Sequence, residues 1–162
     1  MTNKAICNKI IKFWIPDDKY HPEWFKQNPL FDKYIYDNYI SYVNYFYYKL
    51  HFITSEEILA GVIVLDQFVR NIKRVHNFKD NEIKYYNKAL VLSEIWIEND
   101  YHLTQSITNT IFALMPMRHS SSIKKYKKLK SILSELSDKY KDNEVFKKFC
   151  FHTERCYKKL II

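Results

Sequence analysis

Four polar side chains stand at the end of the most apolar segment of the chain, EEILAGVIVLDQFVRN: Asp66, Gln67, Arg70 and Asn71. On an α-helix, Asp66 and Arg70 lie about 40° apart in projection, and Gln67 and Asn71 form a parallel pair one step round. Burying a charge is costly unless it is paired and hydrogen-bonded. Two interpretations follow. Either Asp66 and Arg70 form a structural ion pair, or Arg70 presents its planar fork to an anionic ligand while Asp66 orients it.

A second polar cluster, His119 and Ser120, follows Met115-Pro116-Met117-Arg118. The cluster falls at the expected start of a Ser-capped helix, where backbone N–H groups favour an anion. An imidazole at that place can act as a base or a hydrogen-bond donor. The alternative is that His119 only satisfies a loop carbonyl.

Trp24 is the aromatic residue with the best position for a binding role. Aromatic residues make up 17% of the chain, and most recur at helical spacing, which is typical of core packing. Trp24 instead follows Pro22 in an expected loop. We therefore predict that Trp24 lines a cleft.

Cysteine usage indicates neither a disulfide framework nor a metal site. Cys7, Cys150 and Cys156 are odd in number and have no paired spacing, which favours a reducing compartment. Cys150 and Cys156 lie about 240° apart round a helix, so their thiols would diverge. With no metal spacing and no phosphate-binding glycine loop, we expect no metal ion and no cofactor.

The composition indicates an all-α fold in one domain over residues 1–162, because one Gly and four Pro leave little material for tight turns. Seven helical segments are predicted. They cover residues 4–14, 29–52, 54–71, 80–99, 104–116, 120–136 and 142–162. Short loops between successive helices favour a compact array of about seven antiparallel helices. The third segment is apolar nearly all round, which predicts a central position.

Helix-capping signals place the boundaries of these segments. Asn28-Pro29 gives an N-cap followed by a proline at the first helical position, and Thr54-Ser55-Glu56-Glu57 is a capping box. Asp80 and Thr104 are expected to cap the fourth and fifth segments, and Pro116 is expected to close the fifth.

The net charge of +8 comes from residues 118–162, which hold thirteen Lys and Arg against five Asp and Glu. In the sixth segment, Lys124, Lys125, Lys127 and Lys128 surround an apolar stripe. These lysines either form a solvated outer face or attract nucleic acid or an acidic partner in a salt-dependent way.

No window approaches the roughly 18 apolar residues that a bilayer span requires. The N-terminal sequence MTNKAICNKIIKFW also lacks a signal-peptide cleavage pattern. A cytoplasmic protein without a membrane partner is therefore expected.

Several short motifs follow one another in an order that resembles a known family. They are Phe13-Trp14, Trp24-Phe25, Asn28-Pro29-Leu30-Phe31-Asp32, Leu65-Asp66-Gln67-Phe68-Val69-Arg70-Asn71, Asn77-Phe78 with Asp80, Met115-Pro116 and His119-Ser120. The family is the bacterial domain-of-unknown-function family 924, which reads roughly FW, WF with dPxFD, LDQFxRN, aFxxD and PxxHSE. The resemblance covers most of the chain, and LDQFxRN is its most specific element.

This resemblance implies a helical fold of the tetratricopeptide-like superfamily and no established activity. It also brings the two polar clusters into one family pattern, which favours a shared pocket. The candidates carried over are Asp66, Gln67, Arg70, Asn71, His119 and Ser120.

The chain departs from the family pattern in two places. The family's HSE is His119-Ser120-Ser121 here, so a carboxylate is lost. The family usually continues after a Phe-and-His segment into a basic RFGRxPxRN stretch, whereas Phe149 and His152 are followed here by the ending CYKKLII. If those residues complete the pocket, this shortened member is inactive or has changed its role.

The main hypothesis is a binding or scaffold protein that holds a small anionic ligand or a partner segment beside the third segment. The first alternative is a small hydrolase, intact or degenerate, in which Asp66 or His119 is the base and Arg70 stabilises charge. The second alternative is a nucleic-acid-associated protein that uses the basic final helices.

Overall fold

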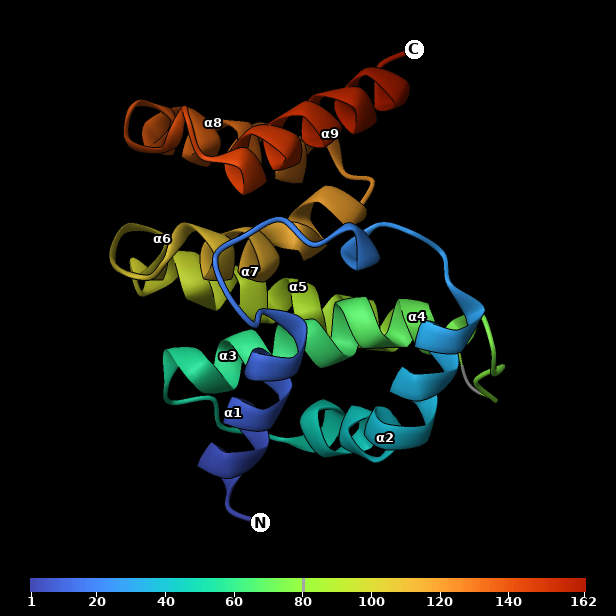
Figure 1. The fold of residues 1–162 in the computed structure, drawn as a ribbon. Coiled ribbons are helices and arrows are strands. Elements are labelled where there is room, and N and C mark those ends of the chain that lie inside the picture. The colour runs from blue at the N-terminus through green and yellow to red at the C-terminus, as the bar shows by residue number, and fades with distance from the viewer. Residues whose placement is uncertain (80) are drawn as a thin grey trace.

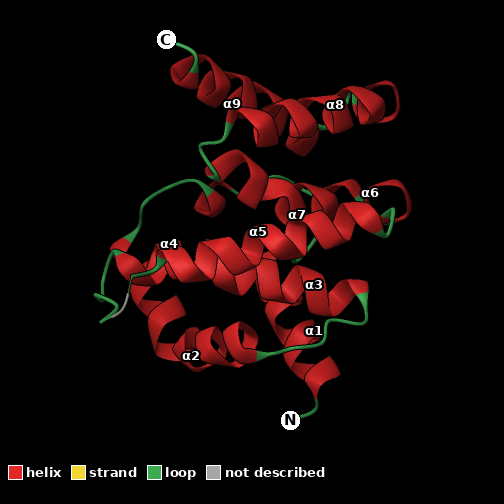
Figure 2. Cartoon of the chain, turned by 180° about the vertical axis from the view of Figure 1, so that it is seen from behind, coloured by secondary structure: helices red, strands yellow, loops and turns green. Residues whose placement is uncertain are grey.

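Helices make up the regular structure of this protein, a computed structural model of which describes residues 1–79 and 81–162. The elements are α1 (Asn3–Trp14), η1 (Pro22–Trp24), α2 (Pro29–Tyr48), α3 (Ser55–Val62), η2 (Ile63–Phe68), α4 (Val69–Lys73), α5 (Ile83–Glu98), α6 (Tyr101–Thr104), α7 (Ile107–His119), α8 (Ile123–Tyr140) and α9 (Glu144–Leu160). The described residues contain no strand, which confirms the all-α prediction (Figure 2). None of the described helices is both long and apolar enough to cross a bilayer.

The helices stack in layers from one end of the molecule to the other (Figure 1). α1 packs on α3, α3 on α5, and α5 on α7, while α2 packs on η2 and α4. α8 and α9 turn back on one another at the C-terminal end and pack mainly on α7. The predicted compact array of antiparallel helices is confirmed, although the third predicted segment is divided into α3, η2 and α4.

Two segments form the centre of the molecule because they are buried on every side. Residues 58–69 and 110–118 are buried without a break. The first stretch is the end of α3 with η2, as its lack of a polar face predicts. The second is most of α7, which links the N-terminal layers to α8 and α9. A buried polar side chain generally finds its partners inside the protein, but Thr110 Oγ1 and Arg118 Nη1 have no hydrogen-bond partner among the described residues.

Two of the predicted helix caps, Asn28 and Thr54, are confirmed. The Asn28 side chain accepts hydrogen bonds from the backbone N–H groups of Leu30 and Phe31, at 3.0 and 3.3 Å. The Thr54 hydroxyl accepts from the Glu57 N–H at 3.2 Å. These bonds satisfy donors that the first turn of a helix leaves without partners.

Several predicted boundaries are wrong. Thr104 ends the short helix α6, and it is Ser106 that caps α7 by accepting from the Asn109 N–H at 3.2 Å. Pro116 lies inside α7, which continues to His119. A proline one turn before the end removes a single backbone donor, and the following backbone is tied down by Ser120 Oγ, which donates to the Met117 carbonyl at 2.8 Å.

Other differences are smaller. α2 ends at Tyr48 rather than near residue 52, and α9 begins at Glu144, with Asn143 as its cap, rather than at residue 142. The predicted cap Asp80 lies outside the described residues.

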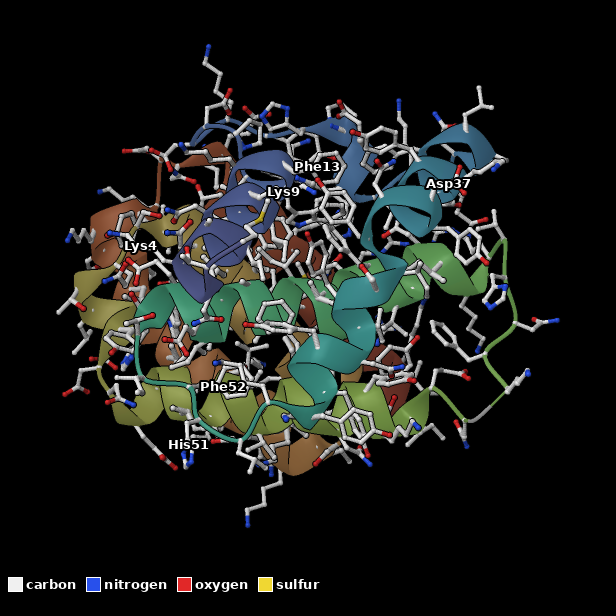
Figure 3. The ribbon with its side chains drawn as sticks, turned by 90° about the horizontal axis from the view of Figure 1, so that it is seen from below. Lys4, Lys9, Phe13, Asp37, His51 and Phe52 are labelled. Carbon is white, nitrogen blue, oxygen red and sulfur yellow. The ribbon has the colours of Figure 1, made fainter. Side chains whose placement is uncertain are left out.

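Gly61, the single glycine of the chain, lets α3 pass close to its neighbours. A Cβ atom at this position would lie 2.9 Å from both Leu92 Cδ1 and Phe52 Cε1. Phe52 belongs to the loop between α2 and α3, beneath these helices (Figure 3). Burial on all sides explains why this helix accepts a residue of poor helix propensity.

We expect Gly61→Leu to lower the free energy of unfolding by about 1–3 kcal/mol, because the new side chain overpacks the contact with Leu92 and Phe52. Gly61→Ala should cost less, since a gain in helix propensity of about 1 kcal/mol offsets part of the crowding. Urea unfolding followed by circular dichroism measures both. Equal stability of Gly61→Leu and the unchanged protein would contradict this account of the contact.

Candidate functional site

The helix that carries Asp66 is not α-helical throughout. Between α3 and α4 it passes through the π-helical segment η2, where the Val69 N–H donates to the Val64 carbonyl, five residues back. Wide turns of this kind occur frequently at functional sites. The projection expected for a regular α-helix is therefore wrong here, although the pairing of Asp66 with Arg70 is observed. No residue pattern in this segment predicts the change from α-helical to π-helical winding.

Asp66 is a buried carboxylate surrounded by donors. Its side chain is fully buried, and Arg70 donates to Oδ1 from Nη2 at 3.2 Å and from Nε at 3.4 Å. Gln67 Nε2 donates to Oδ2 at 3.1 Å. His119 Nδ1 lies 3.0 Å from Oδ2 and 3.2 Å from Oδ1, reaching across from the end of α7. Three side chains thus converge on one carboxylate from two helices.

The environment keeps Asp66 ionised. Burial by itself raises the pKa of the Asp66 carboxyl, but the attraction and hydrogen bonds of His119 and then of Arg70 outweigh it, so the pKa lies below its ordinary value. An ionised carboxylate only accepts hydrogen bonds, so each neighbouring nitrogen must present an N–H to it.

A cavity of about 330 Å³ opens beside this cluster. Its walls come from η2, α4, α5 and the end of α7. The lining residues are Asp66, Arg70, Ile83, Tyr86, Asn87, Leu90, Pro116, His119, Ser120 and Ser121. About a third of the Arg70 side chain and a quarter of the His119 side chain are exposed, so both can be reached from outside.

Four of the candidates from the sequence, Asp66, Arg70, His119 and Ser120, are brought together in this cavity. Gln67 is buried behind it and supports Asp66. The two polar clusters that are far apart in the sequence therefore form one site.

Asn71 points elsewhere. Its side-chain amide donates to Asp32 Oδ1 at 2.9 Å, and Arg74 holds the same carboxylate with two hydrogen bonds of 2.7 Å each. Asp32 is 2% exposed, so this cluster ties α2 to α4 inside the protein. Asn71 acts in packing rather than in the cavity lining.

Trp24 also lies apart from the cavity. It ends the 3₁₀ turn η1 and is 8% exposed, its indole N–H donates to the Trp14 carbonyl at 2.7 Å, and its ring packs on Phe112. It borders a separate hollow of about 230 Å³ with Phe13, Pro16 and Phe31 among the other lining residues.

Helix α5 supplies the wall that sequence reasoning missed. Tyr86 lies under the Arg70 guanidinium, whose central carbon is 4.3 Å from the ring centroid, and Asn87 lies beside it. In the sequence, Ile83, Tyr86 and Leu90 fall on the apolar side of a helix and read as core. No signal in the helical pattern separates a core tyrosine from one that stacks on a cation.

The lysines of α8 differ in their surroundings. Lys125 and Lys128 both bind Glu94 of α5, whereas Lys124 and Lys127 are exposed. Half of the predicted cationic group is thus paired with a carboxylate of the same chain.

The three cysteines, Cys7, Cys150 and Cys156, are free. In residues 1–79 and 81–162, no three His, Cys, Asp or Glu side chains are grouped so that they could hold a metal ion.

The fold and the site define an all-α protein with a buried carboxylate at the wall of a polar cavity. The chain belongs to the family described as bacterial protein of unknown function (DUF924), which matches residues 10–161. This match confirms the resemblance seen in the sequence motifs.

The protein is also similar to a solved structure, the protein of unknown function ATU0120 from Agrobacterium tumefaciens. The two share 18% sequence identity and superpose with a TM-score of 0.66, over 98% of this chain and 84% of that chain. At this identity the likeness shows the fold alone. A comparison with curated proteins found no match.

Proposed function

We propose that this protein binds a small anionic molecule in the cavity between η2, α5 and the end of α7. The observation that carries the proposal is the convergence of Asp66, Arg70 and His119 on one cavity that solvent can reach. An ion pair that only stabilises the fold does not need a solvent-accessible cavity beside it, so the cavity supports a binding role. The tetratricopeptide-like hairpins implied by the family motifs would serve as the rigid scaffold of this site.

The charges around the cavity support an anionic ligand rather than a cationic one. Asp66 already accepts from Arg70, Gln67 and His119, so its negative charge is compensated from within. Arg70 Nη1 has no hydrogen-bond partner in the described part of the chain, so its N–H groups remain available to a ligand. The Tyr86 ring stacks on one side of the Arg70 guanidinium. This contact orients the guanidinium so that its N–H groups can bind a carboxylate or phosphate group.

The size of the cavity favours a small molecule over a partner segment. A volume of about 330 Å³ lies at the lower end of the range for ligand sites, roughly 300–1,000 Å³. Ile83, Leu90 and Pro116 give the walls an apolar part that can cover a short carbon skeleton. A peptide segment, the other ligand expected from the sequence, would need a longer groove.

The test is a titration with succinate and inorganic phosphate, followed by the amide chemical shifts of the protein. We expect shifts at residues of η2, α5 and the end of α7. Arg70→Leu should weaken binding by roughly 10- to 100-fold, because it removes a charge-assisted hydrogen bond. His119→Ala should weaken it as well, while the uncharged analogue succinamide should not bind.

Arg155→Leu and His51→Ala are matched controls, since both residues are exposed and lie outside the cavity. Neither should change the affinity. If Arg70→Leu and His119→Ala leave both binding and stability unchanged, the cavity has no such role.

A further inference from the structure

The contact between Asp66 and His119 fixes which imidazole nitrogen carries the proton. His119 Nδ1 lies 3.0 and 3.2 Å from the two oxygens of an ionised carboxylate. Because that carboxylate can only accept, Nδ1 must donate, and in a neutral imidazole the proton is then absent from Nε2. In this neutral tautomer Nε2 carries the lone pair, and it has no partner among the described residues.

We propose that His119 acts as a general base at this site, activating a water molecule that hydrolyses a small carboxylic ester bearing a second, anionic group. This inference rests on the proposed binding of an anion in the same cavity. Nε2 takes a proton from water as the water oxygen forms a bond to the ester carbonyl carbon. The tetrahedral oxyanion then re-forms the carbonyl, the C–O bond to the alcohol breaks, and the imidazolium returns its proton to the leaving oxygen.

Water is the nucleophile in this proposal because the neighbouring hydroxyl is engaged. Ser120 Oγ donates its proton to the Met117 carbonyl at 2.8 Å and accepts from the Ser122 N–H at 3.4 Å. A serine nucleophile would have to donate to the base instead. Ser120 is therefore turned away from the arrangement that covalent catalysis needs.

The number of cations around the cavity favours a carboxylic ester over a phosphoric one. With Arg70 bound to the anionic group of the substrate, the tetrahedral intermediate of an acyl transfer adds one negative charge, which forms beside the imidazolium produced at His119. Phosphoryl transfer spreads more charge over three equatorial oxygens and is served by several cations. Among the described residues that line the cavity, Arg70 is the one arginine or lysine.

Asp66 is a positioning residue in this mechanism, since it acts through His119. Gln67 and Arg70 hold the carboxylate, and the carboxylate holds the imidazole in one tautomer and one orientation. The full burial of Asp66 excludes water that would otherwise compete for these hydrogen bonds.

The experiment measures the hydrolysis of nitrophenyl half-esters of succinic and glutaric acid by the full chain, with nitrophenyl butyrate as the uncharged comparison. We expect multiple turnovers with a preference for the anionic esters. His119→Gln retains an N–H that can donate to Asp66 but has no base, so it should keep the fold and lower kcat by about 10²- to 10⁴-fold. His51→Ala, a change at an exposed histidine, should leave kcat unchanged.

Two outcomes would overturn the inference, and they can be told apart from failure of the binding proposal. If succinate binds but the half-esters are hydrolysed no faster than by His119→Gln, the base role is wrong and the binding site remains. If His51→Ala loses as much activity as His119→Gln, the hydrolysis comes from surface histidines and the role of His119 is equally excluded. If neither succinate nor phosphate binds, the proposed function itself fails.

Discussion

Asp66→Asn is expected to lower the free energy of unfolding at neutral pH by about 3–5 kcal/mol, the cost of removing one partner from a buried ion pair. The variant keeps the size of the side chain but turns one acceptor oxygen into a donor. That donor would face Gln67, Arg70 or His119, all of which donate to Asp66 in the native protein. At least one buried donor would then lack an acceptor.

The stabilisation by Asp66 should depend on pH in a defined direction. The folded-state pKa of Asp66 lies below its ordinary value of about 4, so the stabilisation is present above that value and is lost as the pH falls through the folded pKa. The difference in the free energy of unfolding between the native protein and Asp66→Asn should therefore be constant from pH 7 to about pH 4 and should become smaller at lower pH. Urea unfolding at pH 7, 5 and 3 measures it.

Asp138→Asn is the control for this series, because Asp138 is exposed on α8. It should unfold like the native protein at each pH. A difference for Asp66→Asn that grows below pH 4 would show that the carboxylate is protonated in the folded state and would contradict the electrostatic account.

Asp32→Asn should also be strongly destabilising, by about 3 kcal/mol. Asp32 accepts two hydrogen bonds of 2.7 Å from Arg74 and one of 2.9 Å from Asn71, and it is 2% exposed. An amide in its place cannot compensate the guanidinium charge. The variant loosens the contact of α2 with α4, so hydrogen exchange should increase in both helices, with a smaller change in α8 and α9.

Asp37→Asn is the matched control, because Asp37 belongs to the same helix and pairs with Lys33 on the surface (Figure 3). Exposed pairs of this kind are screened by solvent and contribute little. If Asp37→Asn and Asp32→Asn change the unfolding midpoint equally, then burial of the Asp32–Arg74 pair has no energetic consequence.

The sequence predicts a polar site of acidic, basic and imidazole side chains, but it identifies only some of the residues that line the cavity. LDQFVRN singled out Asp66 and Arg70, and the motif order placed His119 with them. The helical pattern predicts Tyr86 as a core residue, whereas the structure places it at the cavity under Arg70. The resemblance to the LDQFxRN motif predicts Asn71 in the pocket, yet its partner Asp32 lies 39 residues away in the sequence.

The sequence by itself determined the all-α class, the caps Asn28 and Thr54, and the central place of the segment around Asp66. These features depend on interactions within about four residues or on local apolar periodicity, which a single chain displays directly. The tertiary structure decided the π-helical winding of η2, the continuation of α7 past Pro116 and the meeting of Asp66 with His119 across 53 residues. Such features depend on which surfaces pack together, because a buried polar group is stable only beside the partners that packing brings to it.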